Sequence, residues 1–329
     1  MPLPTISVVF PTFNRSDVVR RTVEHLLAQA YPSDLMEIIV CDNSTDDTPL
    51  AVQKLAAGSR VSVRLLASEE PLPAVKRNQG LRAASGDLVL FINDDVWLRP
   101  DALLVHASAH QEHEGPLAVV GHVDQSPQMP RLPFIEWYRP FGYDRIAGRA
   151  GKTVPYQFFW SMNLSMPRTV MLERELIFHE DWANIGHEDV ELGYRWTHAG
   201  YPVIYRPDAW GEHYHPHDLS SACRLQYSVG RGLRDLQALI PERDLLERYG
   251  VVTFGGSSPR GLSRGLARKA LFNRWTVPPL ERRLNRLDRR RRLAEWSYWK
   301  IMLHHTERGW REQPPRRPIP VQTLAGGTS

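Results

Sequence analysis

The sequence predicts an α/β fold whose core is a sheet with parallel strands. Along residues 1–96, short apolar runs alternate with segments in which apolar residues recur every three or four positions. Strands and helices in that order form crossover units with parallel strands. Polar residues directly follow several of the apolar runs, and open α/β sheets bind ligands at the carboxyl ends of their strands. We therefore expect a functional site at that edge of the sheet.

Four strands and three helices are expected in this region. The strands are short apolar or β-branched runs, at residues 6–10, 37–41, 61–66 and 88–92. Ser16 belongs to a residue type that caps helices, and it precedes the first helix. Val19, Val23 and Leu26 would then lie on one helical face. A second helix joins the second and third strands, and a third covers about residues 74–84.

The remainder of the chain divides into a loop-rich part and a helical part. Residues 97–220 are rich in Pro, Trp, Tyr and His, with one short strand expected at 202–205. Helical spacing dominates from residue 221 to about 311, apart from a loop rich in Gly and Ser at 254–259. Residues 312–329 are rich in Pro and Gly, and we expect this tail to be disordered.

Composition favours a globular protein of a reducing compartment. A chain of 329 residues, 42% hydrophobic and 24% charged, can bury a sizeable core. Its two cysteines, Cys41 and Cys223, are too few for a disulfide framework. No apolar run approaches the roughly 20 residues of a membrane-spanning helix, and the N-terminus lacks the pattern of a signal peptide. We expect a cytoplasmic location.

Positive charge gathers toward the C-terminus. The net charge is +4, and arginines crowd residues 282–292, just before Trp296 and Trp299. Arginines beside aromatic residues suit a peripheral contact with the anionic inner face of a membrane. The alternative is a solvated helix whose aromatic residues pack against the rest of the chain or against a second copy, which would make a homo-oligomer. We do not expect nucleic acid to be the partner.

Acidic residues end two of the expected strands. Residues 93–95 (Asn-Asp-Asp) follow the fourth strand and residues 42–44 (Asp-Asn-Ser) follow the second. Carboxylates at this edge can hold a divalent cation, but they also commonly cap turns and helices. Lys76 and Arg77, early in the next helix, can bind a diphosphate through charge-assisted hydrogen bonds or lie on the solvated surface.

Two later segments carry further candidates. Residues 186–196 open a helix with Glu188 and Asp189, where a carboxylate can act as a general base or merely cap the helix. We expect the helix dipole to keep Asp189 ionised. His213 and His215 follow an expected strand, and residues two apart in an extended segment point to the same side. Both imidazoles can therefore face one site.

The ordered set of these motifs resembles the family 2 glycosyltransferases over about residues 5–220. The matching segments are residues 11–15, 41–44, 76–81, 93–95 and 186–189, together with His213. Each segment alone is unspecific, whereas their order along the chain is specific. The resemblance implies a GT-A fold with a Rossmann-like nucleotide-binding half and a mixed central sheet. It also implies sugar transfer with inversion and a divalent metal cofactor, Mn²⁺ or Mg²⁺.

The resemblance further implies roles for individual residues. Those expected at the nucleotide or donor are Pro11, Thr12, Asn14, Arg15, Asp42, Arg77, Asn93 and Asp94. The expected metal ligands are Asp95 and His213, to which the spacing adds His215. Asp189 would be the general base, with Trp160, Asn163 and Glu188 near the donor sugar and acceptor. Many family members carry Asp where this chain has Asn93. Asp95 matches the family pattern, so we expect metal binding to persist in a weaker form.

These expectations divide the chain by task. Residues 1–96 would bind the nucleotide sugar, residues 97–220 would bind the acceptor and catalyse transfer, and residues 221–311 would form a helical extension. The donor would be a nucleotide-diphosphate sugar, and uridine is the base we expect. The acceptor would be a hydroxyl of a glycan, a lipid-linked molecule or a small molecule.

Two alternatives to sugar transfer remain open from the sequence. A sugar-phosphate nucleotidyltransferase should need a glycine-rich loop after the first strand, where this chain has residues 11–14 (Pro-Thr-Phe-Asn). A non-catalytic protein that binds nucleic acid or membrane should lack the base and metal positions, and both are present here.

Overall fold

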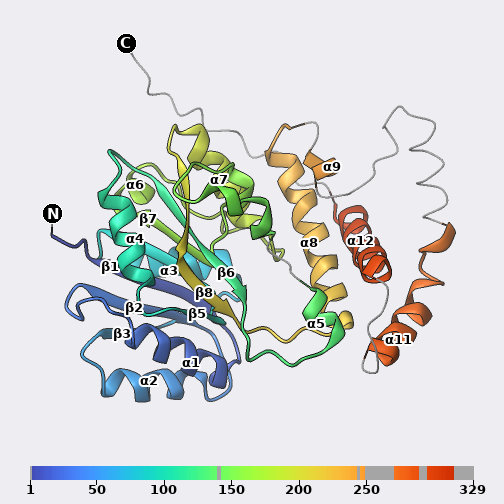
Figure 1. Ribbon diagram of the computed structural model, residues 1–329, viewed down its shortest axis with the longest axis horizontal. Coiled ribbons are helices and arrows are strands. Elements are labelled where there is room, and N and C mark those ends of the chain that lie inside the picture. Colours follow the sequence, from blue (N-terminus) through green and yellow to red (C-terminus); the bar gives the residue numbers. More distant parts are fainter. Residues whose placement is uncertain (1, 139–141, 243–244, 249–269, 289–294, 315–329) are drawn as a thin grey trace, which may run out of the picture. The chain divides into compact units, whose positions relative to one another are not determined.

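The computed structural model describes residues 2–138, 142–242, 245–248, 270–288 and 295–314 (Figure 1). The chain divides into two compact units. The first unit comprises residues 1–129, 140–182 and 188–215, and it holds the sheet. The second comprises residues 130–139, 183–187 and 216–329. The described part of the second unit is helical.

Within the described residues, the first unit is built on an eight-stranded sheet in the order β3-β2-β1-β4-β7-β6-β8-β5. The strands are β1 (Ile6–Thr12), β2 (Met36–Asp42), β3 (Ser62–Ala67), β4 (Leu88–Ile92), β5 (Val96–Leu98), β6 (Ala118–Gln125), β7 (Asn163–Pro167) and β8 (Val203–His213). The first four strands in this order are parallel, as predicted. β7 runs antiparallel to both β4 and β6, which makes the sheet mixed.

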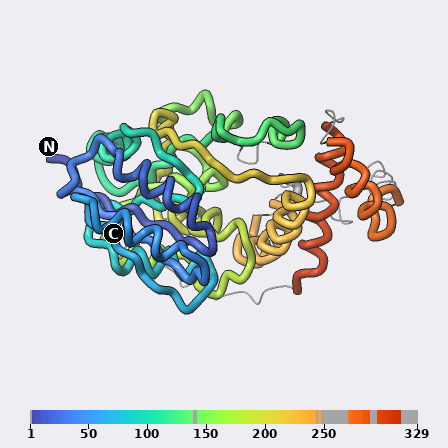
Figure 2. The backbone as a smooth tube through the Cα atoms, turned by 90° about the horizontal axis from the view of Figure 1, so that it is seen from below, coloured from blue at the N-terminus to red at the C-terminus, as the bar shows by residue number. Residues whose placement is uncertain are grey.

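Helices pack on the sheet as the crossovers require. They are α1 (Ser16–Leu27), α2 (Thr48–Ala57), α3 (Pro73–Ala83), α4 (Ala102–Gln111), α6 (Arg168–Glu173) and α7 (Glu188–His198). Right-handed crossovers put α1 and α2 on one face, and they put α3, which returns the chain from β3 to β4, on the other. Figures 1 and 2 show α1 and α2 side by side, and the two helices are in contact. β1, β2 and β4 are buried on both faces, which explains their nearly continuous apolar sequences.

The described part of the second unit is a set of helices around its own apolar core. They are α5 (Pro133–Trp137), α8 (Leu219–Leu239), α9 (Leu245–Arg248), α11 (Val277–Asp288) and α12 (Glu295–Glu312). A Cβ on Gly230 of α8 would lie 2.0 Å from the carbonyl oxygen of Thr306, and one on Gly309 would lie 2.0 Å from that of Tyr227. Glycine therefore lets α8 and α12 approach to backbone contact.

Most predicted elements are confirmed, with small shifts at their ends. The strand expected at 202–205 is longer and continues to His213. Ser16 is not a cap but the first residue of α1, because Arg15 takes the capping position and its side chain bonds two aspartates instead. The predicted loop at 254–259, the arginines at 289–292 and residues 315–329 of the predicted tail lie outside the described residues. The predicted division at residues 96, 220 and 311 stays a prediction.

No helix in the described part of the chain is both long enough and apolar enough to span a membrane.

Candidate active site at the carboxyl edge of the sheet

Antiparallel pairing of β5 with β8 brings together residues that are far apart in the sequence. Asp95 lies between β4 and β5, and Val96 pairs with His213. The backbone N–H of Tyr214 donates to the Asp95 carbonyl oxygen at 2.8 Å. The residues around His213 are therefore held against Asp95 by main-chain hydrogen bonds.

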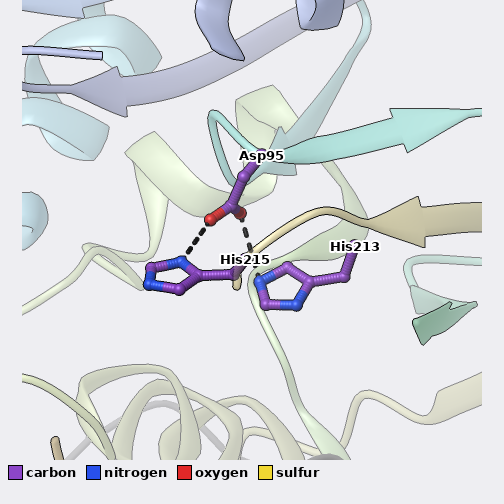
Figure 3. Close-up of side chains that lie close together, drawn as sticks. All are labelled: Asp95, His213 and His215. Carbon is purple, nitrogen blue, oxygen red and sulfur yellow. Dashed lines mark hydrogen bonds and ion pairs between the residues drawn. The ribbon is translucent and has the colours of Figure 1, made fainter. Parts of the chain in front are cut away.

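Asp95, His213 and His215 form a tight cluster at this point (Figure 3). The Nε2 atom of His213 lies 3.3 Å from Oδ1 of Asp95, and the Nδ1 atom of His215 lies 2.7 Å from Oδ2. One ligand atom of each residue lies within 4.8 Å of the other two. The expectation that both imidazoles face one site is confirmed.

Asp94 and Arg15 lie next to the cluster and affect the ionisation of its residues. One Arg15 nitrogen donates to Asp94 at 2.7 Å and to Asp95 at 2.8 Å. Burial alone would raise the pKa of Asp95, but the His213 and His215 imidazoles and the Arg15 guanidinium hold it well below its usual range. The pKa of Asp94 is raised to about 6, because that carboxyl is buried beside the charge of Asp95. Asp95 therefore loses its proton at a lower pH than Asp94 does.

This donor set fits a divalent cation. It offers an ionised carboxylate and two imidazoles, which are ordinary ligands of Mn²⁺ and related ions. Asp95 and His213 have side chains that are only 3% and 9% exposed, whereas that of His215 is 36% exposed. Two of the candidate ligands, Asp95 and His213, are therefore buried, whereas His215 lies at the boundary with solvent.

The loops after β1 and β2 interlock beside the cluster. Thr12 donates through Oγ1 to Asp94 at 2.8 Å. Asn14, in the left-handed backbone region with φ 50°, accepts the Thr45 N–H through its side chain. Asp42 accepts from both the N–H and the hydroxyl of Ser44. Pro11 lies within β1, opposite Cys41 in the register. The predicted nucleotide residues Pro11, Thr12, Asn14 and Asp42 thus share the ends of two adjacent strands.

The two basic residues of α3 have different surroundings. Lys76 is buried and donates to the Thr12 carbonyl and to Asn43. Its ammonium group therefore ties β1 to the loop after β2 and does not lie on the solvated surface. Arg77 donates to Glu188 and to Asn93, each at 3.1 Å. It links the segment after β4 to the start of α7.

Asp189 and Glu188 face different partners at the start of α7. Oδ2 of Asp189 accepts the Ser161 N–H at 3.0 Å, and Oδ1 accepts the Val190 N–H. Glu188 pairs with Arg77. Burial raises the pKa of Asp189 to about 6, and the neighbouring Glu188 charge adds to the rise. Burial therefore outweighs the two backbone N–H donors, but a carboxyl with a pKa of about 6 is still mostly ionised at neutral pH, and the ionised state of Asp189 stays a prediction.

Comparison with known proteins identifies this arrangement. Residues 7–166 match the model of the family described as glycosyl transferase family 2. The chain therefore carries a family 2 glycosyltransferase domain. Known GT-A structures resemble its fold: a Pyrobaculum calidifontis mannosyltransferase matches with a TM-score of 0.64 and 19% identity, over 95% of this chain and 89% of that one. Residues 1–349 of Staphylococcus aureus TarS match with a TM-score of 0.55 and 16% identity, over 95% and 93%.

Curated relatives are also glycosyltransferases. A validoxylamine A glucosyltransferase of Streptomyces hygroscopicus subsp. jinggangensis is 28% identical over 271 residues, which cover 73% of this chain. The chain spans 63% of the length of that relative and 58% of its counterpart from subsp. limoneus. A Campylobacter jejuni GalNAc(5)-diNAcBac-PP-undecaprenol beta-1,3-glucosyltransferase is 36% identical over 102 residues, covering 31% of this chain and 33% of that protein.

The glycosyltransferase domain holds two other predicted residues on β7 and just before it. Trp160 is half-buried and packs edge-on against Tyr143 and Phe158. Asn163 is fully buried, and its side chain bonds His106 and the carbonyl oxygens of His122 and Ala209. These contacts place the Asn163 side chain in the core of the glycosyltransferase domain, where it positions β7 and β8.

Sequence reasoning missed several contacts that shape the site. Arg15 was predicted at the donor, but its bonds to Asp94 and Asp95 were not foreseen. Ser161 holds Asp189 through its backbone N–H, across 28 positions of the sequence. No local signal indicates either contact, since both depend on how strands and loops from separate segments converge.

Proposed function

We propose that this glycosyltransferase moves a sugar from a nucleoside diphosphate donor to an acceptor hydroxyl, with inversion at the anomeric carbon and with help from a divalent cation. The observation that carries the proposal is the pair of Arg77 contacts. Arg77 joins Asn93, beside the Asp94–Asp95 acidic pair, to Glu188, beside the candidate base Asp189. The proposed donor-binding segment and the segment that carries the proposed base are thereby connected through one side chain.

The ends of β1 and β2 are the proposed nucleotide site. Asp42 is the candidate partner for a base N–H, and Thr12 and Asp94 are candidates for the ribose. Arg15 and Arg77 supply cationic groups for the two phosphates. The similar structures are a TarS complex with UDP-GlcNAc and a mannosyltransferase complex with GDP-Man and Mn²⁺. We favour a uridine nucleotide in the donor, with guanosine and deoxythymidine nucleotides as the alternatives.

Asp95, His213 and His215 are the proposed metal ligands. A cation held there would neutralise the negative charge that develops on the departing diphosphate. The protein's part is to keep the Asp95 carboxylate ionised, which the adjacent imidazoles and Arg15 achieve. The Arg15 guanidinium would add a second positive charge beside the cation, and it could donate hydrogen bonds to the phosphate oxygens.

Asp189 is the proposed general base. One displacement forms the bond from the acceptor oxygen to the anomeric carbon as the bond to the diphosphate breaks, and the acceptor proton passes to a carboxylate. A base with a pKa of about 6 is mostly deprotonated at neutral pH and still accepts a proton readily. Two backbone N–H donors fix its orientation.

A donor panel tests this function. The full chain would be incubated with UDP-, GDP- and dTDP-sugars, each with Mn²⁺ or Mg²⁺, and assayed for release of the nucleoside diphosphate and for thermal stabilisation. We expect one donor family to raise the melting temperature and to release diphosphate only when metal is present. No stabilisation by any donor, or equal release in excess EDTA, would contradict the proposal.

An anionic lipid surface is the partner we propose for the helical unit. Leu271, Trp275, Trp296 and Trp299 are each more than half exposed, between 54% and 73%. Exposed arginines on α11 lie between them in the sequence. Large aromatic residues with arginines suit the headgroup region of a membrane, and a lipid-linked acceptor would be found there. A homo-oligomer and a cytoplasmic location stay predictions.

Flotation with vesicles tests the lipid proposal. At low salt the full chain should float with vesicles that contain phosphatidylglycerol and should not float with phosphatidylcholine alone. Trp296→Ala with Trp299→Ala should weaken flotation without changing the melting temperature. Flotation that is absent at low salt, or indifferent to lipid charge, would rule out this surface.

A further inference from the structure

A second cluster of metal-binding side chains lies within the helical unit. Cys223 on α8, Glu281 on α11 and His305 on α12 each offer one ligand atom within 4.8 Å of the other two. We propose that these three residues bind Zn²⁺ and that the ion fastens the three helices together. The proposal is independent of sugar transfer, because it concerns metal binding and the stability of this unit.

The ligand types favour zinc over a hard cation. A thiolate, an imidazole and a carboxylate are each ligands of Zn²⁺, which is borderline soft and usually four-coordinate. Mn²⁺ and Mg²⁺ prefer oxygen-rich sets without sulfur. The Asp95 cluster contains no sulfur, so of these two clusters only that of Cys223 can give a thiolate–metal signal. Three protein ligands leave one coordination position of Zn²⁺ for water.

The spacing of the ligand atoms is close to what zinc requires. Bonds of about 2.0–2.3 Å in a tetrahedron put ligand atoms roughly 3.5 Å apart. The Nε2 atom of His305 already lies 3.2 Å from Oε2 of Glu281. The Cys223 sulfur lies within 4.8 Å of both. A side-chain movement on the order of 1 Å would bring the three ligand atoms to the spacing that zinc requires.

Surrounding contacts hold the ligands in place before a metal arrives. Ser220, one turn before Cys223, donates its hydroxyl to Oε1 of Glu281 at 2.9 Å, and Asn285 donates to the same Ser220 hydroxyl. Hydrogen bonds of this kind to a ligating carboxylate orient it for the metal. Gly230 further along α8 fixes the approach of α12, on which His305 lies. The cluster is therefore preorganised by packing as well as by hydrogen bonds.

The Cys223 thiol would have to release its proton to bind a cation. Cys223 is 1% exposed and packs in the apolar core of this unit. Burial, with the nearby Glu281 charge, raises the pKa of its thiol. The Glu281 carboxylate stays ionised beside His305, whose hydrogen bond lowers the pKa of Glu281. One divalent ion would balance one thiolate and one carboxylate.

Cobalt(II) provides the decisive probe, because thiolate bound to Co²⁺ gives an intense near-ultraviolet charge-transfer band. The metal-free full chain would be titrated with Co²⁺ and then with Zn²⁺. We expect a band that rises to one equivalent and is abolished by Zn²⁺. Cys223→Ser should remove it, whereas Cys41→Ser, a change at the other buried cysteine, should keep it.

Two further variants distinguish loss of metal binding from loss of folding. Glu281→Gln and His305→Gln change side chains that are 18% and 15% exposed, so they should fold. Each should weaken Co²⁺ binding at the thiolate site by at least tenfold, and Zn²⁺ should no longer raise the melting temperature. A wild-type protein without the band, or a band that survives Cys223→Ser, would overturn the proposal and leave the cluster as a hydrogen-bonded network. Asp95→Asn should leave the band intact.

Discussion

Asp189 shows how one side chain can be tuned by its neighbours. It is half-buried, receives two backbone N–H groups and adjoins a second carboxylate, Glu188. Burial and the neighbouring charge raise its pKa to about 6, against the stabilising effect of the N–H donors. A carboxylate in this state can release its proton at neutral pH and take another from an acceptor hydroxyl.

Asp189→Asn should remove the proposed general base and leave donor and metal binding intact. We expect turnover to fall about 10²-fold or more, the usual scale for loss of a general base, with donor and metal affinity unchanged. In the wild type, the transfer rate should rise as pH increases through about 6, because the base must be deprotonated. Calorimetry with donor and metal, paired with rates across pH, measures both effects.

Glu188→Gln is the matched control for that substitution. It should perturb the Arg77 ion pair and change donor binding. The limb of the pH profile should remain but move to lower pH, because the Glu188 charge no longer raises the pKa of Asp189. If Asp189→Asn transfers sugar at nearly the wild-type rate and Glu188→Gln is inactive, Glu188 is the base.

The two histidines of the Asp95 cluster differ in rigidity. His213 is the last residue of β8 and is paired with Val96, whereas His215 lies beyond the strand and is 36% exposed. The distances to Asp95 run the other way, 3.3 Å for His213 and 2.7 Å for His215. We give more weight to rigidity, because an ordered ligand loses less conformational entropy on binding a metal.

His213→Ala should therefore weaken Mn²⁺ binding more than His215→Ala does. We expect a loss of at least tenfold for His213 and a smaller one for His215, measured by calorimetry without donor. Activity should disappear in excess EDTA and return with Mn²⁺. An equal or reversed ranking would make His215 the principal imidazole ligand.

At the scale of elements, β8 is shaped by a bulge opposite Gly121. The pairing of β6 with β8 shifts register between Gly121 and His122, so that residues 207–209 have no partner on β6. The Asn163 side chain fills this point and donates to the Ala209 carbonyl at 2.8 Å. The bulge therefore determines the position of His213 at the end of β8.

Gly121→Ala should disturb this bulge. A Cβ at this position would lie 2.2 Å from Nδ2 of Asn163 and 2.5 Å from the Ala209 carbonyl oxygen. We expect a loss of about 1–3 kcal/mol in the free energy of unfolding, the usual range for overpacking, together with weaker metal binding. Urea denaturation and calorimetry would measure them.

Gly58→Ala is the matched control, since nothing lies within 4 Å of a Cβ there. Its free energy of unfolding should stay within about 0.5 kcal/mol of wild type. If Gly121→Ala is equally stable, Asn163 can move aside and the bulge does not fix the strand.

At the scale of the whole molecule, buried histidines make stability depend on pH. His106 is fully buried, with Ser165 on one ring nitrogen and Asn163 on the other. Burial lowers its pKa to about 4, and that of the adjacent His110 to about 3. Between pH 6.5 and 4 these imidazoles bind protons in the unfolded chain but remain unprotonated in the folded state. The free energy of unfolding therefore decreases as pH falls through that window.

Unfolding by urea at pH 7 and at pH 4.5 tests this linkage. The His106 imidazole should account for roughly 2 kcal/mol of the stability lost on acidification. His106→Gln should be less stable at pH 7 but should lose less on going to pH 4.5, while exposed His198→Gln should behave as wild type. An identical pH dependence in His106→Gln would contradict the buried neutral imidazole.

The sequence was sufficient for elements whose signals are local. Continuous apolar runs located β1, β2 and β4, and the spacing of His213 and His215 predicted that both would face one site. The insertion of antiparallel β7 between β4 and β6 could not be read from the sequence, because pairing partners are chosen by packing between distant segments. The same holds for Lys76, whose burial depends on two backbone loops that meet around its ammonium group.

The pairing of β5 with β8 also has a consequence for how this protein is made. Asp95 and His215 are 120 positions apart, so a nascent chain that has not yet exposed residue 203 carries the carboxylate without either imidazole. Contacts of such long sequence separation form late, since the loop between them must close first. During refolding, Mn²⁺ would then bind only after β8 has paired with β5. That pairing would follow the association of the N-terminal strands.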